Sequence, residues 1–188
     1  MSVREFERMM PTLKKAAAAL READVPFLLG GGLACWARGG PETDHDLDFM
    51  VRQEDAERAL EALEAVGMEP ERPPETWLYK AHDGDVLVDL IFRPASGPVD
   101  EEMFARASLL EVEAVEMPVL SLEDVMVTKL LALGEHNVDY DSVLEVARSL
   151  REQIDWDDVR ARTLHSPYAA AFFTLVEGLG IVGARTGR

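Results

Sequence analysis

Apolar and polar residues recur along the first third of the chain with periods that predict both helices and strands. Amphipathic helices are expected over residues 3–22 and 54–67, where apolar positions return every three or four residues. An apolar run that ends in glycine predicts a buried strand within residues 25–32, and the alternating pattern of residues 46–52 predicts a second strand. Residues 32–39 fit about two turns of helix between these strands. Strands that alternate with helices are typical of an α/β fold.

Two more strands are predicted around an Asp-Gly-Asp turn at residues 83–85. The flanking segments "TWLYKAH" and "VLVDLIFR" have the composition of hairpin strands. The proline-rich segment before them, residues 68–75, is expected to be a loop. A short helix over residues 98–108 and a strand or strand pair over residues 109–120 follow.

The pattern changes after Pro118, because every later segment with a clear period is helical. Ser121, with Asp124 three residues later, resembles a capping box at the start of the first of these helices. We therefore predict a mixed β-sheet flanked by helices, followed by a C-terminal helical region. The expected boundaries are 1–118 for the α/β core, 119–182 for the helical region and 183–188 for a flexible tail.

The charge of the chain narrows the range of partners. The 188 residues carry a formal net charge of −17, with 29% charged and 47% hydrophobic residues. Such an acidic chain offers no extended surface for nucleic acid, which requires clustered basic residues. The acidic charge is compatible with a basic protein as a binding partner. No apolar run is long enough to span a membrane, and the lone Cys35 fits a reducing cytoplasm as a buried core residue, so a cytoplasmic location is expected.

Two carboxylates stand at alternate positions of the second predicted strand. Asp46 and Asp48 would project from the same face, because alternate strand residues share a face. Adjacent carboxylates repel each other unless a cation lies between them, and Mg²⁺ prefers oxygen ligands. The pair therefore predicts half of a site for Mg²⁺ or Mn²⁺, although a solvated strand end is the alternative.

A third carboxylate, Asp89, lies within the otherwise apolar "VLVDLIFR". A buried charge is costly unless it is paired or bound to metal. If this strand lies beside the strand of Asp46 and Asp48, the three side chains converge, and two metal ions held there could assist phosphoryl transfer. The alternative is an ion pair of Asp89 with Arg93 or Lys80.

The three glycines Gly30, Gly31 and Gly32 separate the first predicted strand from the short helix. A backbone without side chains can approach a phosphate closely, and the amides of a helix start can receive it. The run lacks the spacing of a dinucleotide-binding G-x-G-x-x-G motif and the lysine of a P-loop. These glycines therefore predict a phosphate-binding turn of another type.

Together, the glycine turn, the short helix, the D-x-D strand and the later aspartate resemble the signature of the DNA polymerase β-like nucleotidyltransferase superfamily. Residues 25–150 are similar to toxin-like nucleotidyltransferases of the abortive-infection type and to aminoglycoside and lincosamide nucleotidyltransferases. The resemblance implies that Gly31 and Gly32 form the nucleotide-binding turn, with Gly30 as an extra glycine. It implies metal binding by the three residues Asp46, Asp48 and Asp89.

The same resemblance extends the nucleotide site to three further residues. Lys129 matches a lysine that touches nucleotide phosphates in the toxin-like members, although its stem also fits an amphipathic helix. Arg38 and Thr43 match an arginine and a threonine that often precede the D-x-D. Asp139 or Asp141 matches a further acidic position, and Asp141 is also a candidate helix N-cap.

These observations predict a metal-dependent nucleotidyltransferase that uses an NTP and an unidentified hydroxyl acceptor. The charge of the chain favours a small-molecule or protein acceptor over nucleic acid. The alternative is a non-catalytic member of the same fold that binds a nucleotide or a partner, such as one component of a toxin–antitoxin pair.

Overall fold

The computed structural model describes residues 3–42 and 46–183. Its helices are α1 (Val3–Glu22), α2 (Gly31–Trp36), α3 (Ala56–Ala65), α4 (Glu101–Arg106), α5 (Leu122–Ala132), α6 (Asp141–Leu150), α7 (Trp156–Arg162) and α8 (Pro167–Gly178), with 3₁₀ turns at Gln53–Asp55 and Arg151–Gln153. Its strands are β1 (Phe27–Leu29), β2 (Asp46–Val51), β3 (Glu69–Glu71), β4 (Leu78–Asp83), β5 (Val86–Ile91), β6 (Ser108–Val112) and β7 (Val115–Val119). The predicted mixed sheet with flanking helices is confirmed.

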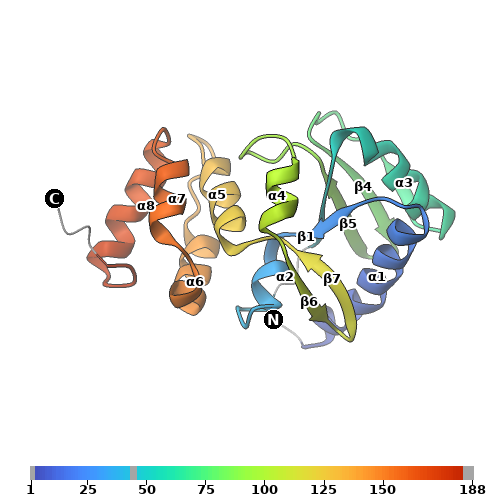
Figure 1. The fold of residues 1–188 in the computed structure, drawn as a ribbon, viewed down its shortest axis with the longest axis horizontal. Coiled ribbons are helices and arrows are strands. Elements are labelled where there is room, and N and C mark those ends of the chain that lie inside the picture. The colour runs from blue at the N-terminus through green and yellow to red at the C-terminus, as the bar shows by residue number, and fades with distance from the viewer. Residues whose placement is uncertain (1–2, 43–45, 184–188) are drawn as a thin grey trace.

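One seven-stranded sheet has the order β3-β4-β5-β2-β1-β7-β6. Strand β2 runs antiparallel to β1 and parallel to β5 at the centre of this sheet. Helices α1 and α3 pack against each other and against β5 (Figure 1). Alternation along β2 buries Leu47, Phe49 and Val51 in the core. The opposite face of the same strand is therefore left to Asp46 and Asp48.

The expectation of a loop over residues 68–75 is wrong for three of its residues. Glu69–Glu71 form β3 at the sheet edge, where Pro70 lies opposite Ala81 of β4. Proline has no N–H for the ladder, so an edge strand is where it is tolerated. The prolines favoured a loop in the prediction, whereas an edge strand tolerates them because it pairs on only one side.

The helices after β7 pack around α5, which contacts α6, α7, α8 and also α2 (Figure 1). This arrangement places α5 beside the short helix that follows the glycine turn. The division of the chain into domains at residue 118 stays a prediction, and residues 184–188 of the expected tail lie outside the described residues. Within the described segments, the helices lack the combined length and apolar character that crossing a membrane requires.

A buried carboxylate joins the C-terminal helices to the core. Asp124 on α5 is fully buried and accepts hydrogen bonds from Ser121 at 2.8 Å and from Nε of Arg106 on α4 at 2.9 Å. Arg162 of α7 also donates to this carboxylate. Burial alone would raise the pKa of Asp124, but the hydrogen bonds from Arg106, Arg162 and Ser121 hold it below its ordinary value. The sequence predicted Ser121 as a cap, and its hydroxyl does accept from the Asp124 N–H at 3.1 Å.

Asp124→Asn is expected to lower the free energy of unfolding by about 2 kcal/mol, because two arginines lose a charged partner. Urea denaturation at pH 7 measures this change. Glu135→Gln, which removes one charge at an exposed loop position, is the matched control and should change stability by less than about 0.5 kcal/mol. Equal stability of the two variants would contradict a stabilising role for this cluster.

Candidate active site

The pairing of β2 with β5 brings the three predicted carboxylates together. In the parallel register Asp48 lies opposite Asp89, and Asp46 lies opposite Leu87. Asp46 precedes Asp48 by two residues on the same face of β2. One carboxylate oxygen from each of these three aspartates lies within 4.8 Å of the other two. The separation is small enough for shared metal ions.

The carboxylates repel one another in this arrangement. Burial, together with the nearby charges of Asp46 and Asp89, raises the pKa of Asp48 to about 8, although Lys129 and Lys80 act in the opposite direction. The pKa of Asp89 is also raised, chiefly by burial. Nζ of Lys80 lies 2.9 Å from Oδ1 of Asp89. Lys80, the alternative partner of Asp89, therefore forms an ion pair with it, and Asp89 is also part of the carboxylate cluster.

The raised pKa of Asp48 predicts that the protein without metal loses stability as the pH rises. The folded state keeps a proton on Asp48 up to about pH 8, whereas the unfolded chain releases it near pH 4. Folding therefore binds a proton between these values, and the free energy of unfolding falls as the pH rises through this window. Between pH 6 and pH 8 the loss is on the order of 2 kcal/mol.

The measurement is urea denaturation in the presence of EDTA at several pH values, for the wild type and for Asp48→Asn. The asparagine cannot titrate, so the difference between the two curves isolates this carboxyl group. Parallel curves for the two proteins would show that Asp48 has an ordinary pKa.

The glycine turn lies against Asp48. The N–H of Gly30 donates to the carbonyl oxygen of Asp48 at 2.8 Å. Gly31 has a φ of +54°, and a Cβ at this position would lie 1.6 Å from Oδ2 of Asp48. A side chain at Gly31 would thus occupy the position of the carboxylate. Sequence reasoning assigned this glycine to phosphate approach, whereas the structure shows that it also makes room for a candidate metal ligand.

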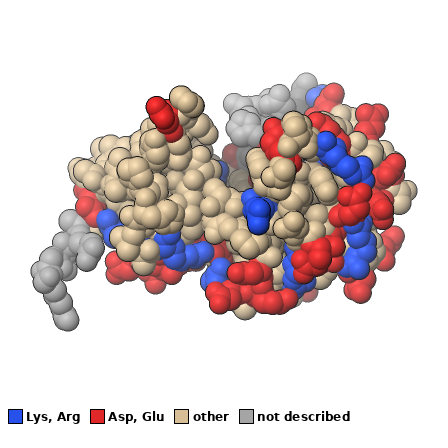
Figure 2. Space-filling model, turned by 90° about the horizontal axis from the view of Figure 1, so that it is seen from above, with Lys and Arg blue, Asp and Glu red and all other residues tan. Residues whose placement is uncertain are grey.

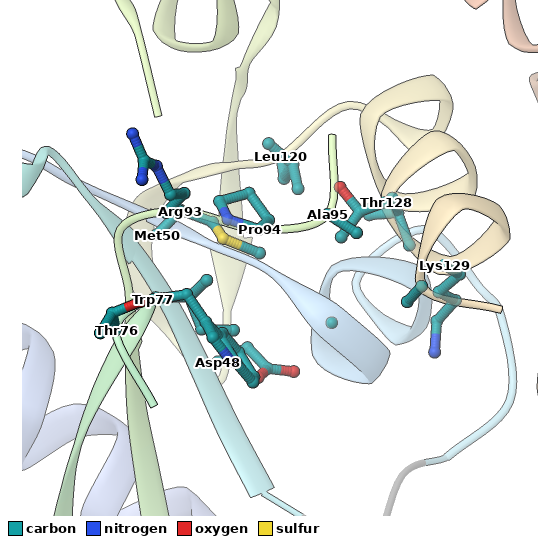
Figure 3. A pocket seen from close by; sticks show the side chains of 14 residues that line it. Asp48, Met50, Thr76, Trp77, Arg93, Pro94, Ala95, Leu120, Thr128 and Lys129 are labelled. Atoms are coloured by element: carbon teal, nitrogen blue, oxygen red, sulfur yellow. The ribbon is translucent and has the colours of Figure 1, made fainter. Parts of the chain in front are cut away.

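Among the residues that the structure describes, a larger and a smaller cavity adjoin the carboxylates. The larger has a volume of about 620 Å³ and lies between β2, β5, α5 and the residues Thr76 and Trp77 that precede β4, while the smaller, of about 180 Å³, lies between α2, β2 and α6. Asp48 and Lys129 line both cavities. Figure 3 shows Lys129 on α5, on the opposite side of the cavity from Asp48. The predicted lysine is therefore placed with the carboxylates by the fold.

Other predicted site residues lie elsewhere. The guanidinium of Arg38 donates to the carbonyl oxygens of Ala34, at 3.0 Å, and Val119, at 3.3 Å, and Arg38 lines neither cavity. Burial lowers its pKa below the ordinary arginine value. Thr43 lies outside the described residues.

Gly32 lines the smaller cavity and Gly31 the larger one. Of the two acidic candidates further along the chain, Asp141 begins α6, and its N–H donates to the carboxylate of Asp139 at 2.9 Å. Asp141 is therefore not the N-cap: Tyr140 occupies that position, and the side chain of Asp139 accepts the hydrogen bond. Neither aspartate is among the residues that line the two cavities.

Sequence reasoning missed several lining residues of the larger cavity. Met50 and Ile91 follow Asp48 and Asp89 by two positions on the same strands. The two-residue period that placed the aspartates on one face also places these side chains there, so alternation could have identified them. Trp77 lines the cavity with 40% of its surface exposed, and only the structure assigns it to the wall.

Comparison with known protein families finds a match over most of the chain. Residues 3–175 match the sequence family described as "Uncharacterised nucleotidyltransferase". No curated protein sequence matches the chain significantly.

Solved structures share the fold. The crystal structure of ANT(2″)-Ia in complex with adenylyl-2″-tobramycin has a TM-score of 0.65 at 14% identity, over 88% of this chain and 99% of that one. A solution structure of the antibiotic-resistance factor ANT(2″)-Ia gives 0.62 at 18% identity, over 92% and 96%. The lincosamide antibiotic adenylyltransferase LnuA, bound to lincomycin, gives 0.52 at 14% identity, over 82% and 99%. At these identities the likeness concerns the fold alone.

Proposed function

Because the chain belongs to the family described as uncharacterised nucleotidyltransferases, we propose that it transfers a nucleoside monophosphate from an NTP to a hydroxyl group. The reaction depends on Mg²⁺ or Mn²⁺. The observation that carries this proposal is the cluster of Asp46, Asp48 and Asp89, whose oxygens lie within 4.8 Å of one another. A cluster of this kind fits oxygen-preferring divalent cations.

The electrostatics of the cluster support a cation as its natural occupant. Burial and the neighbouring carboxylates raise the pKa of Asp48 to about 8, so its negative charge is unfavourable without a cation beside it. Asp46, Asp48 and Asp89 would hold the ions. When bound, divalent ions neutralise phosphate charge and align the attacking and leaving oxygens.

The remaining steps use the chain's own groups. Asp89 accepts the proton of the acceptor hydroxyl, whose oxygen forms a bond to the α-phosphorus. The bond between the α-phosphorus and the bridging oxygen to the β-phosphate breaks, and pyrophosphate leaves with the electron pair. Lys129 offsets the charge of the phosphates, since its side chain lines both cavities. The backbone of Gly31 and Gly32 lies close to where the phosphates would bind.

The charge of the surface supports an acceptor other than long nucleic acid. The net charge is −17. On the described part of the face in Figure 2, basic side chains lie among acidic ones and form no continuous basic band. A polyanion would meet repulsion over most of such a surface. We therefore favour a small molecule or a protein side chain as the acceptor.

The test uses the purified chain with α-³²P-labelled ATP, CTP, GTP and UTP and Mg²⁺. Candidate acceptors are tobramycin, lincomycin, a metabolite extract, the protein itself and total RNA. Metal-dependent release of pyrophosphate with label in an acceptor is expected. Metal-dependent NTP binding without transfer to any acceptor would favour the non-catalytic alternative. Absence of both binding and transfer would contradict the proposal.

A further inference from the structure

The larger cavity beside Asp48 is enclosed mainly by apolar side chains. Met50 of β2 and Ile91 of β5 extend the face that carries Asp48 and Asp89, and Val125 and Ala132 face them from α5. Figure 3 shows Thr128 and Lys129 on α5, across the cavity from Asp48, and Trp77 also lines this cavity. With a volume of about 620 Å³, the cavity is within the size range of small-molecule sites.

The walls carry little negative charge despite the acidic chain. Among the described residues that line this cavity, Asp48 is the one carboxylate, while Arg93 and Lys129 are basic. A ligand with several ammonium groups would lose its hydration there, and the carboxylate cluster would be the one source of negatively charged partners among the described lining residues. Burying unpaired charge is costly. The lining thus disfavours a polycationic acceptor.

The smaller cavity has the opposite character. Glu42, Glu145 and Ser142 line it together with Gly32 and Asp46. In-line transfer places the acceptor and the leaving pyrophosphate on opposite sides of the α-phosphate. The polar cavity, whose carboxylates can accept hydrogen bonds, suits the ribose hydroxyl groups of the nucleotide. Asp48, shared by both cavities, then lies between the nucleotide and the larger cavity.

We propose that the 620 Å³ cavity binds the acceptor, and that this acceptor is an uncharged alcohol with an aromatic or branched aliphatic body. This inference rests on the proposed nucleotidyl transfer. The apolar body packs against Met50, Ile91 and Trp77 and gains the free energy of leaving water. The hydroxyl group points to the carboxylate cluster, where its oxygen replaces pyrophosphate on the α-phosphorus and its proton passes to Asp89.

The test is calorimetric binding of 2-naphthylmethanol, as an uncharged aryl alcohol, and of tobramycin, as a polycation. Both are titrated into the full chain with Mg²⁺, with and without saturating α,β-methylene-ATP. The alcohol should bind more tightly than tobramycin, and the nucleotide analogue should leave its affinity unchanged or increase it. Ala132→Phe, which fills the cavity from an exposed position of α5, should weaken the alcohol at least about tenfold. Ala171→Phe, at an exposed position of α8, is the matched control and should leave the affinity unchanged.

Three results would overturn the assignment: tighter binding of tobramycin, displacement of the alcohol by the nucleotide analogue, or equal affinity in the Ala132→Phe and Ala171→Phe variants. Displacement would assign the cavity to the nucleobase. Pyrophosphate release without alcohol binding would overturn the acceptor class alone. Alcohol binding without any metal-dependent NTP binding would instead overturn the proposed function, so the two failures are distinguishable.

Discussion

Asp48→Asn is expected to lower the rate of nucleotidyl transfer at least about 1,000-fold, which corresponds to about 4 kcal/mol of transition-state free energy. Asp48 belongs to the carboxylate cluster and lines both cavities. An asparagine keeps the size of the side chain but removes the negative charge that would hold a cation. Because the same change removes repulsion from Asp46 and Asp89, the variant without metal should be at least as stable as the wild type at pH 8.

The measurements are pyrophosphate release under Mg²⁺, calorimetric Mg²⁺ binding and urea denaturation in EDTA. Asp46→Asn should lower pyrophosphate release and Mg²⁺ binding in the same way, because it removes another carboxylate of the cluster. Asp85→Asn, at an exposed position of the β4–β5 turn, removes the same charge and should keep full activity. Loss of folding in Asp48→Asn, or activity equal to that of Asp85→Asn, would mean that Asp48 serves the structure and not the reaction.

The sequence predicted the carboxylate cluster because each of its two strands carries a local signal. The two-residue alternation of β2 placed Asp46 and Asp48 on one face, and an aspartate within an apolar strand marked Asp89. Their meeting required one assumption about pairing, that β5 lies beside β2, and the structure confirms it. Their roles in metal binding and catalysis stay predictions.

Contacts between distant segments could not be predicted in the same way. Asp124 looked like part of a helix start, yet its partners Arg106 and Arg162 come from α4 and α7. Trp77 shares a cavity wall with residues of α5, which lies far from it in the sequence. Arg38 matched a motif, but its guanidinium contacts main-chain oxygens of Ala34 and Val119. Such placements depend on tertiary packing, which no local period encodes.

The glycine turn was predicted from the sequence, but its contact with Asp48 was not, and this contact leads to the second prediction with a large effect. Gly31→Ala is expected to lower the free energy of unfolding by about 4 kcal/mol, at the upper end for single substitutions. Its Cβ would lie 1.6 Å from Oδ2 and 2.7 Å from Cγ of Asp48, and the φ of +54° adds strain for any residue with a side chain. Asp48 would have to move, so activity should fall together with stability. Urea denaturation and pyrophosphate release measure the two effects.

Two comparisons separate the overlap with Asp48 from the backbone strain. Gly39→Ala is the matched control, since Gly39 has a φ of +85° but a Cβ there would meet nothing within 4 Å; the expected cost is about 1 kcal/mol of strain alone. In an Asp48→Ala background the overlapping carboxylate is gone, so Gly31→Ala should cost about 2 kcal/mol less than in the wild type. An equal cost in both backgrounds would show that the approach of Asp48 does not require this glycine. If Gly31→Ala instead keeps full stability but loses NTP affinity, the glycine serves the phosphates alone, because its side chain then obstructs the nucleotide and not the carboxylate.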